Sequence, residues 1–311
     1  MKKRLLSVLL VGALAASMLV GCGGSAGSDE KPLVVGYSNF SSKFSPFFAE
    51  TAYDQDAQTM TQVPLLTNDR QGGMIYKGIE GETISYNGTD YTYYGPANVV
   101  VTENEDGTVT YTYTLRDMTW SDGQPVTAKD YEFAWKRAAN EENAFDYGYM
   151  FENVVGYPND LAVTALDDKT LEVTIANQVA YWNELLAFPT FFPVREDVVA
   201  NEGWNTDPST YVCNGMYTMD SWEHNSVITL KKNENHPDAA EGTMPTLKFY
   251  LSDDANNMLT NFKNGEWKLI DDVPTNEMAA LKQDYPDEFV VAGQIGTYYV
   301  CWNINEDLRA W

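Results

Sequence analysis

The sequence contains few of the residues that build metal sites, disulfide frameworks or nucleic-acid interfaces. Its 311 residues include two His, three Cys and 20 Lys and Arg against 45 Asp and Glu, for a net charge of −25. The two histidines, His224 and His236, lie in polar turns, where we expect solvated side chains, so no metal ion or cofactor is predicted. The charge argues against binding to nucleic acid, because phosphate contacts need a basic surface.

Common catalytic motifs are also absent: there is no G-x-S-x-G, H-E-x-x-H or C-x-x-C, and no phosphate-binding glycine loop. Carboxylates are plentiful, and a pair of them could serve a glycoside hydrolase. The most loop-like pairs are Asp253-Asp254 and Asp271-Asp272. A solvated acidic surface explains the same residues, and we favour it over catalysis.

Apolar and aromatic residues are abundant and indicate a folded protein. They make up 44% and 13% of the chain, which excludes intrinsic disorder. A length near 300 residues suggests about two domains. Several aromatic residues fall beside Gly or Asn in expected loops, where they could line a concave ligand site or pack on a sheet. They are Tyr147, Tyr149, Tyr298, Tyr299 and Trp302.

The first 31 residues have the organisation of an export signal. A short basic segment, 1–4, precedes an apolar segment that ends at residue 21, which is typical of a secretory signal peptide. Leu19-Val20-Gly21-Cys22 resembles the lipobox of bacterial lipoproteins, which implies cleavage before Cys22 and lipidation of that cysteine. The alternative is an ordinary cysteine in an uncleaved anchor. Residues 22–31 are predicted to form a flexible tether, on which the acidic body stands off the membrane.

The other two cysteines, Cys213 and Cys301, are far apart in the sequence. Their positions do not settle whether they pair. We favour two unpaired thiols.

Hydrophobic periodicity predicts interspersed strands and helices. Residues 33–37 read as a strand, 54–66 as a helix ended by Pro64, and 69–98 as irregular β structure. Apolar residues alternate with Thr in 109–115, which predicts a half-buried strand after the turn at Asp106-Gly107.

The rest of the sequence also predicts interspersed helices and strands. Thr127 and Asp130 predict the capped start of a helix whose buried face carries Tyr131, Ala134, Trp135 and Ala138. Further β structure is expected in 161–175 and 217–231, and further helices in 181–188, 256–264 and 275–284. There is no regular βαβ period, so the fold class is mixed α/β, or α+β.

One segment identifies a family. Residues 113–130, YTLRDMTWSDGQPVTAKD, resemble the signature of extracellular solute-binding proteins of family 5, the peptide-binding receptors of ABC importers. Residues 214–217 with Trp222, and 230–233, resemble further blocks of that family. So do residues 285–288. The resemblance runs from about residue 33 to residue 303 and is strongest to the oligopeptide-binding branch.

The resemblance implies a periplasmic-binding-protein-like fold of type II. Residues 1–21 would be the signal peptide and 22–31 the tether. A discontinuous lobe I would comprise 32–58 and 177–267, a small inserted domain 59–176, and the start of lobe III 268–311. Family members are much longer than this chain, so the second ligand-binding lobe is expected to be largely missing.

The resemblance also implies a function. We expect a non-enzymatic, monomeric receptor without cofactor, anchored by lipid at the extracellular face of the bacterial cytoplasmic membrane or in the periplasm. It would capture peptides between its lobes and deliver them to the permease and ATPase of an ABC transporter. A secreted glycoside hydrolase is the alternative, or, within the family, a receptor for nickel chelates or sugars.

The family's ligand contacts map onto three places in this sequence: an early loop, an aromatic residue of the small domain and the hinge-side segments. The oligopeptide branch has Glu where this chain has Cys301, and amides where it has two Asp, so the preferred ligand charge is open. The predicted contacts are Glu50, Thr51, Ala52, Tyr147, Asp271, Asp272, Tyr299 and Cys301.

Residues 23–311 alone are expected to bind peptides poorly. By the resemblance, the carboxylate that holds the ligand's α-amino group lies in the part of the family pattern that follows residue 311. Isothermal titration of this chain with peptides tests the expectation, and a micromolar affinity would contradict it.

Overall fold

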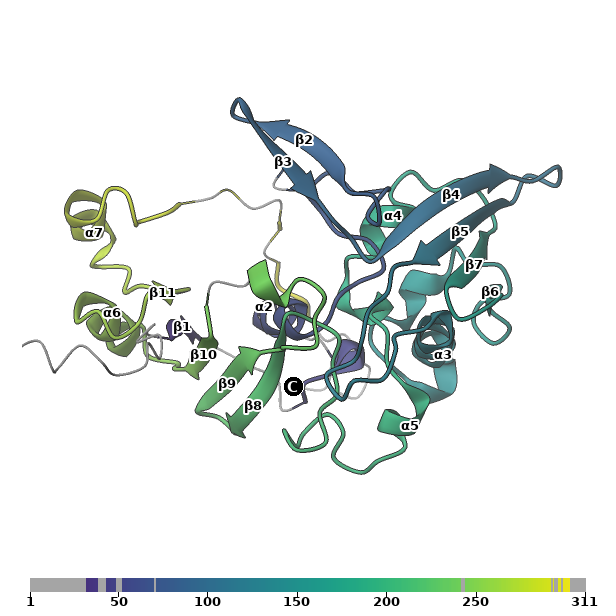
Figure 1. Ribbon diagram of the computed structural model, residues 1–311. Helices are drawn as coiled ribbons and strands as arrows, with labels where there is room; N and C mark the ends of the chain where they lie inside the picture. Colours follow the sequence, from purple (N-terminus) through teal and green to yellow (C-terminus); the bar gives the residue numbers. More distant parts are fainter. Residues whose placement is uncertain are drawn as a thin grey trace, which may run out of the picture.

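The computed structural model describes residues 32–38, 43–48, 52–69, 71–241, 244–291, 293, 296–297 and 299–302. The predicted signal peptide, Cys22 and the tether lie outside these residues. Two sheets, each with its own buried cluster, organise the described part of the chain (Figure 1). None of the helices described is both long enough and apolar enough to cross a membrane.

The first unit is a five-stranded sheet in the order β11-β1-β10-β9-β8. Strand β1 runs parallel to β10 and to β11, whereas β9 is antiparallel to both of its neighbours. The strand predicted at 33–37 and the hairpin predicted at 217–231 are confirmed. The strands are β1 (Leu33–Tyr37), β8 (Tyr217–Glu223), β9 (Val227–Lys232), β10 (Thr246–Leu251) and β11 (Leu269–Ile270).

The second unit is a four-stranded antiparallel sheet in the order β4-β5-β7-β6. The apolar residues of β5 that alternate with Thr are buried, as the period of two predicted. A separate hairpin of β2 (Glu82–Tyr86) and β3 (Thr89–Tyr93) projects beside this sheet (Figure 1). The sheet consists of β4 (Ala97–Glu103), β5 (Val109–Leu115), β6 (Val163–Ala165) and β7 (Thr170–Ile175).

Helix α3 (Ala128–Ala139) covers the second sheet and begins at a capping box. The Thr127 N–H donates to Asp130 Oδ2 over 2.8 Å, which satisfies a backbone donor that the helix leaves free. Tyr131 and Trp135 are fully buried on its inner face, as predicted. The Trp135 Nε1–H donates to the Phe191 carbonyl at 2.8 Å and so fixes the ring in the core.

The remaining helices are short. Helix α2 (Ala52–Thr61) starts two residues before the segment predicted at 54–66 and ends before that segment does. Pro64 explains the early end, because it cannot donate a helical hydrogen bond and disfavours helical geometry in the residue before it. The others are α4 (Trp182–Leu185), α5 (Glu196–Val199), α6 (Ala255–Lys263) and α7 (Met278–Asp284), with 3₁₀ turns at Pro46–Phe48, Glu141–Asn143, Gly148–Phe151, Pro189–Phe191 and Ala239–Glu241.

The core of the second unit extends along the chain beyond residue 176. Trp182, Leu186, Phe191 and Val194 are buried in the same cluster as the inner faces of α3 and β5. The predicted inserted domain ends at 176, so its core is completed by residues that were predicted to belong to lobe I. The division of the chain into domains stays a prediction.

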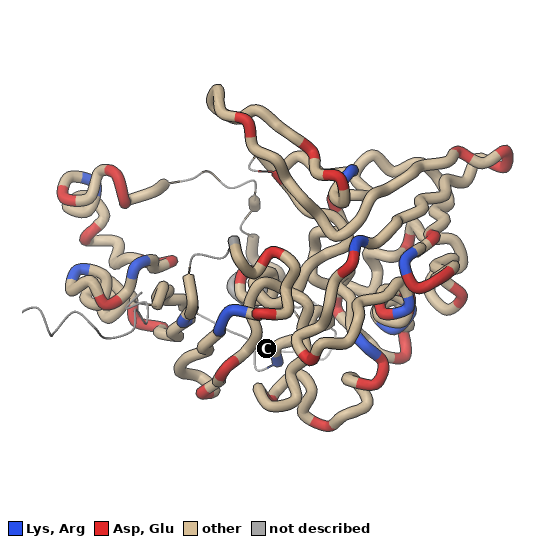
Figure 2. Tube along the Cα trace, in the orientation of Figure 1, with Lys and Arg blue, Asp and Glu red and all other residues tan. Residues whose placement is uncertain are grey.

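Acidic residues are distributed over both units. Figure 2 shows Asp and Glu along both parts of the molecule and at the loop between β4 and β5, with fewer Lys and Arg. No single basic face offsets them in this view, in keeping with the net charge of −25.

Gly36 in β1 is a position where any side chain would collide with the core. A Cβ atom there would lie 2.2 Å from the Trp267 ring, which stacks on Tyr250 with 5.5 Å between ring centroids. We expect Gly36→Ala to lower the free energy of unfolding by about 1–3 kcal/mol, because the ring must leave its position. Urea denaturation measures this. Gly293→Ala is the control, since a Cβ at 293 meets open space, and equal effects of the two substitutions would contradict the account.

Candidate functional site

The parallel strands of the first sheet end together at one edge. Because β10 and β11 are both parallel to β1, the residues that follow Tyr37, Leu251 and Ile270 emerge side by side. Hydrogen bonds tie them together: the Ser252 N–H donates to the Tyr37 carbonyl (2.9 Å), and the Asp271 N–H donates to the Gly36 carbonyl (3.3 Å). Ligands of open α/β sheets bind outside such carboxyl ends. We call this place the carboxyl edge.

Asp271 is the charged side chain that the carboxyl edge positions most firmly. Its Oδ2 accepts hydrogen bonds from the Ser38 N–H (3.2 Å) and the Ser38 hydroxyl (2.8 Å). Its Oδ1 is buried and has no hydrogen-bond partner within the described residues. A buried carboxylate oxygen without a donor is costly. The arrangement therefore leaves one carboxylate oxygen at the carboxyl edge without a donor.

The residues near Asp271 make ordinary hydrogen bonds. Asp272 is exposed, and its Oδ1 accepts from the Val273 N–H at 2.7 Å. The Tyr37 hydroxyl donates to Asp56 Oδ2 at 3.0 Å and so connects the end of β1 to helix α2. Ser38 was not among the predicted contacts. The sequence signal that could have indicated it is a hydroxyl residue directly after a buried parallel strand.

Tyr147 lies on the second unit, between two 3₁₀ turns. Its half-buried ring packs edge-on against Phe188, with 4.8 Å between centroids, and lies 6.4 Å from the ring of Tyr149, which is exposed. The next residue must be small, because a Cβ on Gly148 would lie 2.7 Å from the Ala138 carbonyl oxygen. The backbone thus holds an aromatic pair at the surface of this unit.

The other predicted contacts are not brought together. Glu50 and Thr51 lie outside the described residues, and Ala52 is the first residue of α2. Tyr299 and Cys301 are exposed. Among the residues that the structure describes, no hydrogen bond or ring contact joins them to Asp271 or Tyr147. The grouping of all eight residues in one site stays a prediction.

The cysteines and the Asp253-Asp254 pair behave as the simpler interpretations predicted, whereas Asp271 is partly buried and not a solvated surface residue. Cys213 and Cys301 are both unpaired, and burial raises the pKa of the Cys213 thiol to about 11. Asp254 caps helix α6 by accepting from the Asn256 and Asn257 N–H groups, which accounts for one member of a loop-like pair. Within the described residues, no cluster of three or more His, Cys, Asp or Glu could hold a metal ion.

The prediction of two solvated histidines is wrong for His236. His224 is exposed, and its Nε2 lies 3.2 Å from the Thr206 carbonyl. His236 is only 9% exposed, and its Nδ1 accepts from the Asp238 N–H at 3.1 Å. The sequence of a polar turn does not distinguish a turn exposed to water from one that, like this one, packs between two units.

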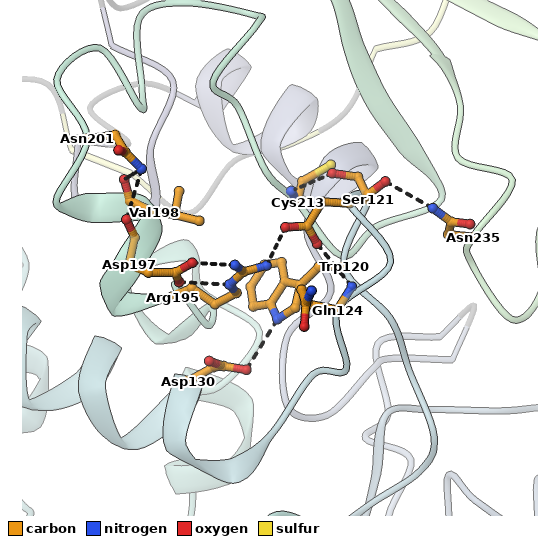
Figure 3. A network of polar contacts seen from close by, with 11 residues as sticks. Trp120, Ser121, Gln124, Asp130, Arg195, Asp197, Val198, Asn201, Cys213 and Asn235 are labelled. Atoms are coloured by element: carbon orange, nitrogen blue, oxygen red, sulfur yellow. Dashed lines mark hydrogen bonds and ion pairs between the residues drawn. The ribbon is translucent and has the colours of Figure 1, made fainter.

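The segment Trp120-Ser121-Asp122 holds the two units together, and we call its contacts the junction (Figure 3). The Ser121 N–H donates to the Cys213 carbonyl at 2.7 Å, and the Cys213 N–H donates back to the Ser121 hydroxyl at 3.2 Å. The Asn235 amide donates to the Ser121 carbonyl at 2.9 Å. The turn thus binds the first unit through the N–H and carbonyl of Ser121 and through its hydroxyl.

Side chains of the second unit support the junction from the other side. The Trp120 Nε1–H donates to Asp130 Oδ2 at 3.2 Å, and Arg195 Nη1 donates to Asp122 Oδ2 at 2.6 Å. Arg195 Nε also donates to Asp197 Oδ1 at 2.9 Å, at the start of α5 (Figure 3). Burial raises the pKa of Asp130, and the hydrogen bonds from Thr127 and Trp120 oppose that shift.

Comparison with known proteins agrees with this architecture. The model of the bacterial extracellular solute-binding proteins, family 5 Middle, matches residues 86–310. The oligopeptide-binding protein OppA of Bacillus subtilis is 36% identical over 238 residues, which are 71% of this chain and 43% of OppA. The probable deoxycholate-binding periplasmic protein YgiS of Escherichia coli is 32% identical over 225 residues, 68% of this chain and 42% of YgiS.

The solved structures give the same fold. The structure of Listeria monocytogenes OppA bound to peptide superposes with a TM-score of 0.65 at 26% identity, over 77% of this chain and 46% of that one. The predicted mixed α/β fold of periplasmic binding proteins is confirmed. The chain spans less than half the length of the curated relatives it matches.

The buried carboxyl group of Asp130 makes a testable contribution to the pH dependence of stability. Its pKa in the folded state lies above the ordinary value of 3.8. Ionisation of Asp130 therefore lowers the free energy of unfolding as the pH rises from the ordinary pKa through the raised one. In Asp130→Asn the amide oxygen can still accept hydrogen bonds from Thr127 and Trp120, but the side chain at position 130 no longer ionises.

We therefore expect the free energy of unfolding of Asp130→Asn, relative to the parent, to increase between pH 4 and pH 7. Urea denaturation across that range measures the difference. Asp287→Asn, at an exposed position, controls for the lost charge. A difference that does not change with pH, or that falls, would show that Asp130 is not perturbed as described.

Proposed function

The chain belongs to the bacterial extracellular solute-binding proteins of family 5, and from this premise we propose that it contributes the carboxyl-edge side of a site that captures peptides. The family consists of solute-binding proteins rather than enzymes, so the prediction of a non-enzymatic protein is confirmed and the glycoside hydrolase alternative is not retained.

The observation that carries the proposal is the unpartnered Oδ1 of Asp271. The carboxylate is held in place by two hydrogen bonds from Ser38, so its free oxygen has a fixed direction. An extended peptide presents N–H groups and, at its N-terminus, an ammonium group, and either can donate to this oxygen.

The acidic character of the carboxyl edge favours a ligand with amino groups over an anionic ligand. Asp271 and the exposed Asp272 stand next to each other at the end of β11, on a chain of net charge −25. Of the relatives compared, one is named for oligopeptides and another for deoxycholate, which is a carboxylate. A carboxylate placed against Asp271 would be repelled, so the peptide is the ligand class that fits this edge.

The remaining parts of the functional proposal concern the whole protein. Family membership supports delivery to the permease and ATPase of an ABC transporter. Anchoring through a lipid on Cys22 is supported by the order of basic segment, apolar segment and lipobox in residues 1–22. A monomer without cofactor is proposed on the same grounds.

The ligand test uses nuclear magnetic resonance, which registers weak binding. Trialanine with free termini is titrated into the isotopically labelled chain, and the amide resonances of residues 36–38 and 270–272 are followed. We expect these resonances to shift, and we expect Asp271→Asn to weaken binding about tenfold, the loss typical of one charged hydrogen bond.

The matched control is Asp90→Asn, which removes the same charge from the exposed β2–β3 hairpin. It should leave the affinity unchanged. Shifts confined to other parts of the chain, or an equal loss in the two variants, would overturn the assignment of the carboxyl edge as the peptide site.

A further inference from the structure

The turn at residues 233–238, which follows β9 in the first unit, holds the second unit beside the junction. The Thr119 hydroxyl donates to the Asn235 carbonyl at 2.6 Å, and the Asn235 side-chain amide donates to the Ser121 carbonyl at 2.9 Å. The turn is fixed to its own unit, because the buried Asn233 side chain donates to a backbone carbonyl there. One short segment therefore links the two units.

An ion pair crosses the same boundary. Arg116, which follows β5, pairs with Asp238 at the end of the turn. Their side chains are only 15% and 34% exposed, so water and salt screen the pair less than they would on an open surface. The position of Asp238 therefore affects how firmly the turn holds the second unit.

His236 fixes the position of Asp238. Its ring is buried, and its Nδ1 accepts a hydrogen bond from the Asp238 N–H at 3.1 Å. A ring nitrogen that accepts carries no hydrogen, so this bond requires the neutral ring. A protonated imidazole carries a hydrogen on each nitrogen and cannot accept. Proton uptake by His236 would therefore break the bond and leave a positive charge in a nearly closed space, which is unfavourable.

Charged groups face the His236 ring from both units. Burial lowers its pKa from the ordinary 6.5, Asp238 in the same turn opposes that shift, and Arg116 of the second unit adds to it. Tyr94 lines the same hollow between the units as these three residues. Glu234, in the same turn, is exposed. The balance of these surroundings favours the neutral ring while the turn is in place.

We propose that His236 makes the contact between the two units sensitive to acid. At about pH 7.5 the neutral ring holds Asp238, and the turn holds the second unit. In acid, proton uptake removes the acceptor and places a positive charge beside Arg116, so the turn releases the second unit. Each sheet keeps its own buried cluster, because neither cluster includes His236. The proposal is independent of the peptide site, since the turn shares no residue with the carboxyl edge.

The direction of the effect follows from the difference between the two states. In the released turn the ring faces water and regains its ordinary pKa, whereas in the closed turn its pKa is lower. The released state therefore binds the proton more readily. The closed contact is fully favoured above the ordinary pKa of 6.5 and is weakened as the pH falls below it.

Hydrogen exchange of the full chain tests the proposal. It is followed by nuclear magnetic resonance at pH 7.5 and pH 5.5 and corrected for the intrinsic pH dependence of exchange. The reporter is the Ser121 N–H, which is bonded to the Cys213 carbonyl across the boundary. We expect its protection to fall by up to about tenfold, the limit for one proton over this range. The N–H groups of Tyr113 in β5 and Leu230 in β9 should keep theirs, because they lie inside the sheets.

His236→Asn is the matched variant. The Asn Oδ1 takes the place of Nδ1 and can accept from Asp238, but it does not ionise. The variant should keep the protection of the Ser121 N–H at pH 7.5 and lose the response to acid. Asp130, whose pKa is also raised, is present in both proteins, so its titration does not distinguish them. His224→Asn changes the exposed histidine and should respond to acid as the parent does.

A second measurement keeps the test valid if His236→Asn disturbs the turn. The chain has only two histidines, so the spectrum of His224→Asn assigns the ring resonances of His236 in the parent. We expect these resonances to titrate with a midpoint below 6.5. A midpoint at or above that value would overturn the proposal. So would an unchanged protection of Ser121 in acid, an equal loss at Tyr113 and Leu230, or an acid response retained in a folded His236→Asn.

Discussion

The hydrogen bonds between Ser121 and Cys213 are the constraint on which the rest of the molecule depends. Each unit has its own buried cluster, so the packing within a unit does not fix its position against the other. The junction helps to fix that position through the Ser121 hydroxyl and through backbone groups, which cost free energy if they are buried without hydrogen bonds. Trp120 and Arg195 then hold the turn that presents those groups. The motif residues of the 113–130 segment thus act as scaffold, and ligand recognition is placed elsewhere.

Asp271 Oδ1 is among the buried side-chain polar atoms that have no hydrogen-bond partner within the described residues. It lies at the end of three parallel strands. Proteins retain buried polar atoms without partners where something else supplies the partner. The carboxyl edge is acidic, which suits an amino group or a peptide N–H.

The sequence predicted local structure well where one periodicity or one cap dominates. The alternation in β5 and the Thr127–Asp130 cap were both recognisable because each depends only on neighbouring residues. Long-range features were not accessible in this way. The sequence around His236 does not indicate that Arg116, over a hundred residues earlier in the chain, lies close to it. The sequence after β1 likewise does not indicate that Ser38 binds Asp271. Those contacts are created by strand order and by the packing of two units.

The central claim is that a ligand donates a hydrogen bond to Asp271 at the carboxyl edge. The most direct test is a crystal structure of the protein purified from its natural host together with whatever ligand it retains. The account predicts ligand density beyond the ends of β1 and β11, with a ligand nitrogen within hydrogen-bonding distance of Asp271 Oδ1. A ligand bound elsewhere, with only water at Asp271, would contradict it.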